Sequence, residues 1–154
     1  MKITFIGGGN MASAIIGGLR KKGHADLALR VVEVDAAARA RLARDYALSV
    51  HEKIDAQAVA GDCIVLAVKP QDLRAVATVL APHLAGQLVI SIAAGIRTRD
   101  LARWLGGYQR IVRAMPNTPA LIGAGCTGYF ATGDAADARS EEHTSELQSR
   151  FGIS

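Results

Sequence analysis

Residues 2–12 read KITFIGGGNMA, and this stretch decides the fold class. An apolar run the length of a short β-strand ends in three glycines, and residues 10–23 then carry apolar side chains at helical spacing. Gly7, Gly9 and Ala12 form a G-x-G-x-x-A pattern between the two predicted elements. The first glycine permits a sharp turn, the second lets a pyrophosphate approach backbone N–H groups, and the small Ala12 lets the helix pack closely on a sheet. A glycine-rich turn without a ligand is the alternative.

The next predicted strand, LRVVEVD at residues 29–35, ends in an acidic residue. Asp35 lies 26 positions after Gly9, where a carboxylate can bond a ribose 2′-hydroxyl and repel a 2′-phosphate. This position favours NAD, and Glu33 could share the role. Asp35 could also serve as the N-cap of the helix that follows, which is compatible with a cofactor contact.

Basic residues near the same turn leave the choice of cofactor open. Arg39 and Arg41 could receive a 2′-phosphate if the loop folds back, which would favour NADP. The sequence therefore predicts NADP or NAD as the cofactor.

Strand and helix patterns alternate along the chain as far as Met115. Continuous apolar runs such as CIVLAV at residues 63–68 are typical of strands buried on both faces of a parallel sheet. The alternation predicts an α/β fold with a Rossmann-type doubly wound parallel sheet. Further strands are expected at 47–50, 88–92, 109–115 and near 126–130, and further helices at 36–46, 55–61, 69–84 and 98–106, the last with Thr98 as its N-cap.

Three later segments also follow predicted strands, at the sheet edge where doubly wound folds bind ligands. Lys69 and Pro70 come first, and Lys69 is either a cofactor contact or an ordinary surface lysine. Ala93, Ala94 and Gly95 leave room for a flat ring or simply form a tight turn. Asn117 and Thr118, held between two prolines, can orient a carboxamide or form an Asx-type turn.

Composition excludes several other classes of protein. The 154 residues are 50% hydrophobic and 21% charged, which fits one globular domain. Cys63 and Cys126 form no CxxC pair, and the four histidines lack metal-ligand spacing, so neither a metal site nor a catalytic nucleophile is expected. The net charge of +4 suits a nucleotide phosphate, whereas scattered basic residues and few aromatics argue against nucleic acid. No apolar run is long enough for a membrane span, and a cytoplasmic location is expected.

Four motifs in this order resemble one known family: FIGGGNMASAI at 5–15, LAVKPQD at 66–72, SIAAGI at 91–96 and IVRAMPNTPALIGAG at 111–125. The chain resembles the nucleotide-binding domain of pyrroline-5-carboxylate reductase. The resemblance implies hydride transfer from NADPH or NADH to 1-pyrroline-5-carboxylate, giving L-proline. The cofactor-binding residues that it implies, together with Asp35 from the spacing above, are Ile6, Gly7, Gly8, Gly9, Asn10, Met11, Ala67, Val68, Lys69, Pro70, Ala93, Ala94, Gly95 and Asn117.

The resemblance also implies a second, all-helical domain that is missing from this sequence and that makes family members homo-oligomeric. Half a site is then present, so the chain is expected to bind nucleotide and to turn over substrate poorly or not at all. A non-catalytic dinucleotide-binding module is the alternative.

The chain divides into a predicted NAD(P)-binding domain, residues 1–138, and a polar tail, residues 139–154. Within the tail, RSEEHTSELQS at 139–149 matches the in-frame translation of a common sequencing-library adapter. We therefore expect the tail to be an artefact of a truncated gene fragment, with a natural disordered tail as the alternative.

Overall fold

The computed structural model describes residues 1–24, 26–116 and 127–132. Strands and helices alternate through most of these residues, as predicted. The strands are β1 (Lys2–Ile6), β2 (Ala28–Val32), β3 (Ser49–His51), β4 (Cys63–Leu66), β5 (Leu88–Ser91), β6 (Ile111–Pro116) and β7 (Thr127–Thr132). The helices are α1 (Asn10–Lys21), α2 (Ala36–Tyr46), α3 (Pro70–Leu80), the 3₁₀ turn η1 (Ala81–His83) and α4 (Thr98–Trp104).

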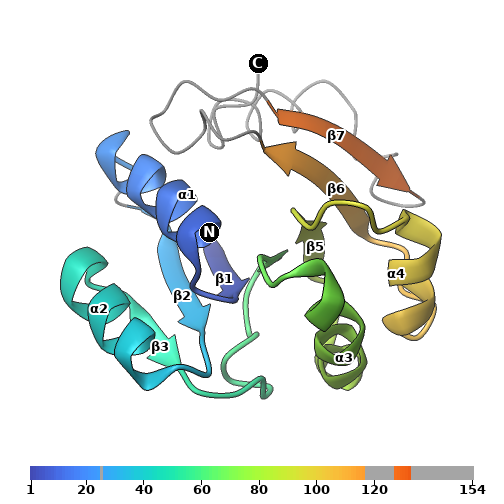
Figure 1. The fold of residues 1–154 in the computed structure, drawn as a ribbon, viewed down its shortest axis with the longest axis horizontal. Helices are drawn as coiled ribbons and strands as arrows, with labels where there is room; N and C mark the ends of the chain where they lie inside the picture. The colour runs from blue at the N-terminus through green and yellow to red at the C-terminus, as the bar shows by residue number, and fades with distance from the viewer. Residues whose placement is uncertain (25, 117–126, 133–154) are drawn as a thin grey trace.

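The described strands form one sheet in the order β3-β2-β1-β4-β5-β6-β7. The pairs from β3 through to β6 are all parallel, which confirms the doubly wound arrangement. The chain works outward from β1 to β3 and then returns to β4 on the other side of β1 (Figure 1). The boundary between β1 and β4 is therefore the switch point of the topology, where ligands bind in folds of this kind.

Two apolar cores cover the two faces of the sheet. One gathers side chains of α1 and α2 against Ile3 and Phe5, and the other gathers side chains of α3 and α4 against Ile64 and Leu66. All of β4 is buried, as its continuous apolar run predicts. The helices thus lie in pairs on opposite faces, α1 with α2 and α3 with α4 (Figure 1).

The predicted doubly wound parallel sheet is confirmed from β3 to β6, and β7 adds one antiparallel strand beside β6. The third strand, expected at 47–50, lies at Ser49–His51, because α2 ends at Ala47 in a left-handed conformation. Thr98 is not an N-cap, because α4 begins at Thr98 itself with Arg97 in the capping position.

The helix predicted over residues 55–61 is wrong, since these residues form a single turn before β4. Side chains of the sheet take the carbonyl groups that a helix would need. Thr4 Oγ1 donates to the carbonyl of Ala58 at 2.9 Å, and Arg30 Nη1 donates to the carbonyls of Gln57 and Ala60 at 3.0 and 2.8 Å. The backbone is thus bound to β1 and β2 instead of continuing into a second helical turn.

Within the described residues, no helix is both long enough and apolar enough to cross a membrane.

Candidate functional site

The glycine turn between β1 and α1 lies at the switch point of the sheet. Gly7 has φ +96°, a conformation that favours glycine, and a Cβ there would lie 2.9 Å from the carbonyl oxygen of Ala67. Its N–H bonds the carbonyl of Val32 at 2.8 Å, which ties the turn to β2. The first glycine of the motif therefore makes the sharp turn that the sequence predicts.

Gly9 plays a different part from Gly7. It is exposed, and a Cβ at this position would meet no atom within 4 Å. Gly9 is the N-cap of α1, with no side-chain hydrogen bond to the helix terminus and no acidic residue in the first turn. No capping side chain and no acidic residue of α1 itself satisfies its first N–H groups, and this helix end suits a phosphate group. Ala12 is fully buried beneath them, as the motif predicts.

Gly8 and Glu33 join the glycine turn to the end of β2. The N–H of Gly8 donates to Glu33 Oε2 at 2.8 Å, and the N–H of Asp35 donates to Glu33 Oε1 at 2.9 Å. A Cβ on Gly8 would collide with Leu42 and would lie 3.3 Å from Glu33 Oε2. Glu33 is therefore a clamp between the two loops, a role that the sequence did not reveal. The contact depends on the pairing of Ile6 with Val32 in the sheet, which brings the residues after β2 beside the glycines.

Asp35 caps α2, as its alternative interpretation predicted. Its Oδ1 accepts from the N–H of Ala38 at 2.7 Å. Arg39 folds back over the same loop, where its Nη1 donates to the carbonyls of Glu33 and Val34, both at 2.8 Å. The guanidinium of Arg39 and the carboxylates of Glu33 and Asp35 therefore lie in the same loop at the end of β2. Among the described residues Arg39 forms no ion pair.

The ends of β4 and β5 continue the same edge of the sheet. Ala67 donates its N–H to the carbonyl of Ile6 at 2.8 Å, so residues 67–70 lie directly beside the glycine turn. Lys69 and Pro70 are exposed, with Lys69 at the N-cap of α3. The structure thus brings the β4 candidates together with the β1 candidates.

The turn after β5 is shaped by Ser91, a buried residue that the sequence did not single out. The N–H of Ala93 donates to Ser91 Oγ at 3.4 Å, and Gly95 has φ +76°. Of the three predicted residues in this turn, Ala93 is buried, whereas Ala94 and Gly95 are exposed. A Cβ on Gly95 would meet no atom within 4 Å, which leaves the room that the small residues predict.

The side chains of the residues predicted around the glycine turn differ in their exposure. The side chain of Ile6 is buried in the α3–α4 core, whereas Asn10 is exposed and Met11 is half-buried at the start of α1. Asn117 and the tail at residues 139–154 lie outside the described residues.

Other chemistry-bearing residues do not converge on this edge. Cys63 is buried in β4, and burial raises the pKa of its thiol to about 12, which makes it a poor nucleophile. Over residues 1–24, 26–116 and 127–132, no three His, Cys, Asp or Glu side chains are grouped so that they could hold a metal ion.

A family model described as NADP oxidoreductase, coenzyme F420-dependent, matches residues 2–95. The chain belongs to this family. Curated relatives of the chain are pyrroline-5-carboxylate reductases. The one from Pseudomonas aeruginosa is 45% identical over 154 residues, covering 99% of this chain and 56% of the relative. The one from Haemophilus influenzae is 45% identical over 131 residues, covering 84% of this chain and 48% of the relative.

Solved structures similar to this chain include pyrroline-5-carboxylate reductases, as the curated relatives do. A pyrroline-5-carboxylate reductase from Coxiella burnetii superposes with a TM-score of 0.84 at 35% identity, over 98% of this chain and 56% of that one. The Plasmodium falciparum enzyme, solved with NADP bound, gives 0.80 at 25% identity, over 99% and 56%. The resemblance drawn from the sequence motifs is confirmed, and this chain spans about half the length of the relatives it matches.

Proposed function

We propose that this chain is the cofactor-binding half of a pyrroline-5-carboxylate reductase, and that the whole enzyme reduces 1-pyrroline-5-carboxylate to L-proline in proline synthesis. The observation that carries the proposal is the free space beside Gly9, where α1 begins without a capping side chain, at the boundary between β1 and β4. The names of the relatives supply the substrate class.

The residues present fit a dinucleotide. The glycine turn would hold the pyrophosphate through backbone N–H groups, with Ala67, Val68, Lys69 and Pro70 lining its far side. Ala94 and Gly95 leave space for the nicotinamide ring, and the end of β2 lies where the adenosine ribose would be placed. The cofactor, when bound, supplies the hydride that converts the C=N bond to an amine.

The chain's own contribution is binding and orientation. Gly7 brings the turn against Ala67, so that the ends of β1 and β4 form one continuous surface. Proton transfer and substrate binding would then depend on the other half of the enzyme, because this chain spans about half the length of the relatives it matches. We therefore expect the chain alone to bind cofactor with no measurable turnover.

For the adenosine end, we propose that Arg39 receives the 2′-phosphate and that NADPH is accepted. Both carboxylate oxygens of Glu33 already accept backbone N–H groups, and Asp35 caps α2. Arg39 is held at the loop by two carbonyl groups, and its charge is not neutralised by an ion pair among the described residues. A guanidinium is well suited to a phosphate group.

Cofactor binding is tested by titrating NADPH and NADH into the chain and monitoring the fluorescence of the nucleotide. Gly9→Asp places a carboxylate where the pyrophosphate would lie, at a φ of −69° that any residue adopts. Aspartate is a favourable N-cap, so the variant should melt at the same temperature or higher while its NADPH affinity falls by at least about tenfold. Gly18→Ala, in the middle of α1 with open space around it, is the matched control. Unchanged NADPH binding by the Gly9→Asp variant would overturn the assignment.

The test of the reaction needs the coding sequence beyond codon 138. Proline formation by the extended protein, and its absence in the 154-residue chain, would support both the proposed activity and the proposal that residues 139–154 are foreign. Activity of the 154-residue chain alone would contradict the proposal of half a site. A natural stop after the tail would favour the non-catalytic binding module.

A further inference from the structure

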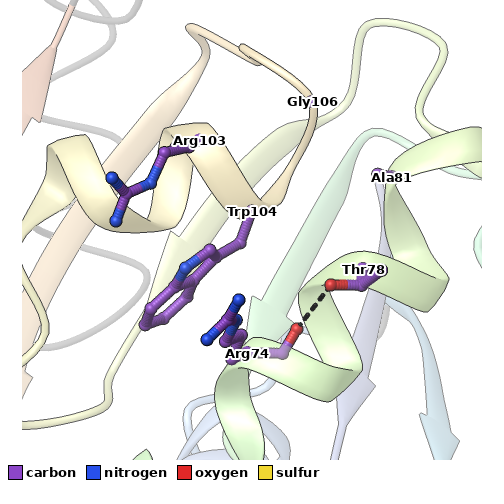
Figure 2. A pocket seen from close by; sticks show the side chains of 6 residues that line it. All are labelled: Arg74, Thr78, Ala81, Arg103, Trp104 and Gly106. Carbon is purple, nitrogen blue, oxygen red and sulfur yellow. Dashed lines mark hydrogen bonds between the residues drawn. The ribbon is translucent and has the colours of Figure 1, made fainter.

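A groove lies between α3 and α4, on the side of these helices away from the sheet edge described above. It is open to solvent, has a volume of about 720 Å³ and is lined by Arg74, Thr78, Ala81, Arg103, Trp104 and Gly106 (Figure 2). None of the lining residues belongs to the candidate cofactor edge, because α3 starts at that edge and runs away from it.

One wall of the groove is a stripe of α3. Leu73, Ala77 and Leu80 of this helix are fully buried against the sheet, which fixes its rotation. Arg74 and Thr78 therefore lie one turn apart on the neighbouring stripe, facing α4. Thr78 Oγ1 donates to the carbonyl of Arg74 at 2.9 Å, so its single hydroxyl hydrogen is used within α3 and the oxygen can only accept a further hydrogen bond (Figure 2).

The other wall is the end of α4, which is fixed by two glycines. The N–H of Gly106 bonds the carbonyl of Arg103 at 3.1 Å, and the N–H of Gly107 bonds the carbonyl of Ala102 at 2.8 Å. Both glycines have positive φ, +69° and +85°, so the helix ends in a Schellman motif. Trp104, in the last turn, packs partly into the core between the helices and the sheet.

The charge in the groove is unbalanced. Arg74 forms no ion pair among the described residues, and Arg103 has one, to Asp100 at 3.2 Å, in which the arginine side chain is 74% exposed. An exposed pair of this kind contributes little and leaves Arg103 able to bind another anion. Guanidinium groups bind phosphate through two parallel hydrogen bonds, so the groove favours a phosphate group.

An aromatic surface lies beside these charges. In Figure 2 the indole ring of Trp104 lies between the guanidinium groups of Arg74 and Arg103. An indole offers a flat surface on which a second ring can stack. The groove thus combines an unpaired cation, a second cation and an aromatic surface.

We propose that this groove is a second ligand site, for a small phosphate monoester whose organic part is a flat ring. The phosphate pairs chiefly with Arg74, Arg103 adds its charge, and the ring lies on Trp104. The proposal is independent of the cofactor edge and of the reaction proposed above.

The chain carries its own reporter, because Trp104 is its only tryptophan. Phenyl phosphate, which has the charge and the ring but no nucleotide, is titrated while Trp104 fluorescence is followed. A saturable change with a Kd of about 1 mM or below is expected. Inorganic phosphate and phenol, each with half of the ligand, should bind at least about tenfold more weakly.

Variants separate the two arginines. Arg74→Ala should weaken phenyl phosphate at least about tenfold, whereas Arg103→Ala, which also releases Asp100, should weaken it less. Arg74→Lys keeps the charge without the planar fork and should give an intermediate affinity. Arg44→Ala, at an exposed arginine of α2 on the other face of the sheet that also has an exposed ion pair, is the matched control and should bind as the unmodified chain does.

Melting temperature and NADPH titration of each variant separate a lost ligand contact from a lost fold. The proposal is overturned by any of three results: no saturable response to phenyl phosphate, an equal response in Arg74→Ala, or an equal affinity for inorganic phosphate. A response to an acidic peptide with none to phenyl phosphate would also overturn it and would assign the groove to a protein partner.

Discussion

Substitutions of Arg39 and Asp35 should change the preference between NADPH and NADH in opposite directions. Arg39→Ala removes the cation that two backbone carbonyls hold over the β2 loop, so NADPH affinity should fall about tenfold or more with little change for NADH. Asp35→Ser keeps an N-cap for α2 but removes a negative charge, so it should shift binding toward NADPH without loss of stability. Parallel titrations of the two nucleotides measure both effects. An unchanged ratio in Arg39→Ala would reject the assignment of the 2′-phosphate to this residue.

Cys63 should be inert in the folded chain. Burial raises the pKa of its thiol to about 12, so the folded protein keeps the proton at pH values where the unfolded chain, with a thiol of ordinary pKa 9.0, releases it. This contribution to stability is complete below pH 9 and is lost as the pH rises toward 12. In a Cys126→Ser background a thiol reagent at pH 8 should label Cys63 only as fast as the protein opens, and at once in denaturant. Rapid labelling without denaturant would contradict the burial of this thiol.

At the scale of single residues, sequence patterns located the site better than they assigned its roles. The spacing of the motif predicts a sharp turn at Gly7, free space at Gly9 and close packing at Ala12, and the structure has all three. Each of these features depends on local backbone geometry. The clamp between Glu33 and Gly8 was not predictable from spacing, since it depends on the register between β1 and β2. Asn117 and the cofactor contacts themselves stay predictions.

At the scale of elements, the buried Gln87 links the loop before β5 to the turn before β4, at the end of the sheet opposite the candidate site. Gln87 Oε1 accepts the N–H of Ala85 at 2.6 Å and its Nε2 donates to the carbonyl of Val59 at 3.2 Å. Gln87→Leu leaves the buried carbonyl of Val59 without this donor and removes the hydrogen bond to Ala85, so it should lower the free energy of unfolding by about 1–3 kcal/mol. Denaturant unfolding measures it. Gln109→Leu, at an exposed amide, should change stability by less than about 0.5 kcal/mol, and equal losses in the two variants would contradict the role of Gln87.

Elements whose boundaries depend on local signals were predicted well, and those that depend on tertiary contacts were not. Pro70 at the start of α3 and Pro82 in the 3₁₀ turn after it lie where proline geometry requires. The turn at residues 55–61 has helix-forming composition, yet Thr4 and Arg30 bind its carbonyl groups. β7 pairs antiparallel with β6, and this direction depends on a contact between the two strands that the local sequence does not encode.

At the scale of the whole molecule, the candidate cofactor edge spans the boundary at which the sheet reverses its order. The loops after β2 and β1 belong to the first half of the chain, and those after β4 and β5 belong to the second. A ligand that contacts all four loops therefore couples the two halves, whereas a ligand in the α3–α4 groove contacts only the second. The two sites should consequently be distinguishable by where each ligand protects the backbone.

NADPH at about one hundred times its Kd should stabilise the chain by about 2.7 kcal/mol, which corresponds to a rise in melting temperature of about 5–10 °C for a domain of this size. Hydrogen exchange should then slow at residues 7–12, 67–70 and 92–95, and at the loop after β2. Phenyl phosphate should instead slow exchange around the last turns of α3 and α4 and leave the glycine turn unchanged. At an NADPH concentration near the Kd of the unmodified chain, the Gly9→Asp variant, which keeps the groove, should show little of the first pattern, and with phenyl phosphate it should retain the second. If NADPH protected only one half of the sheet, the ligand would not cross the β1–β4 boundary, and the switch point would not be its site.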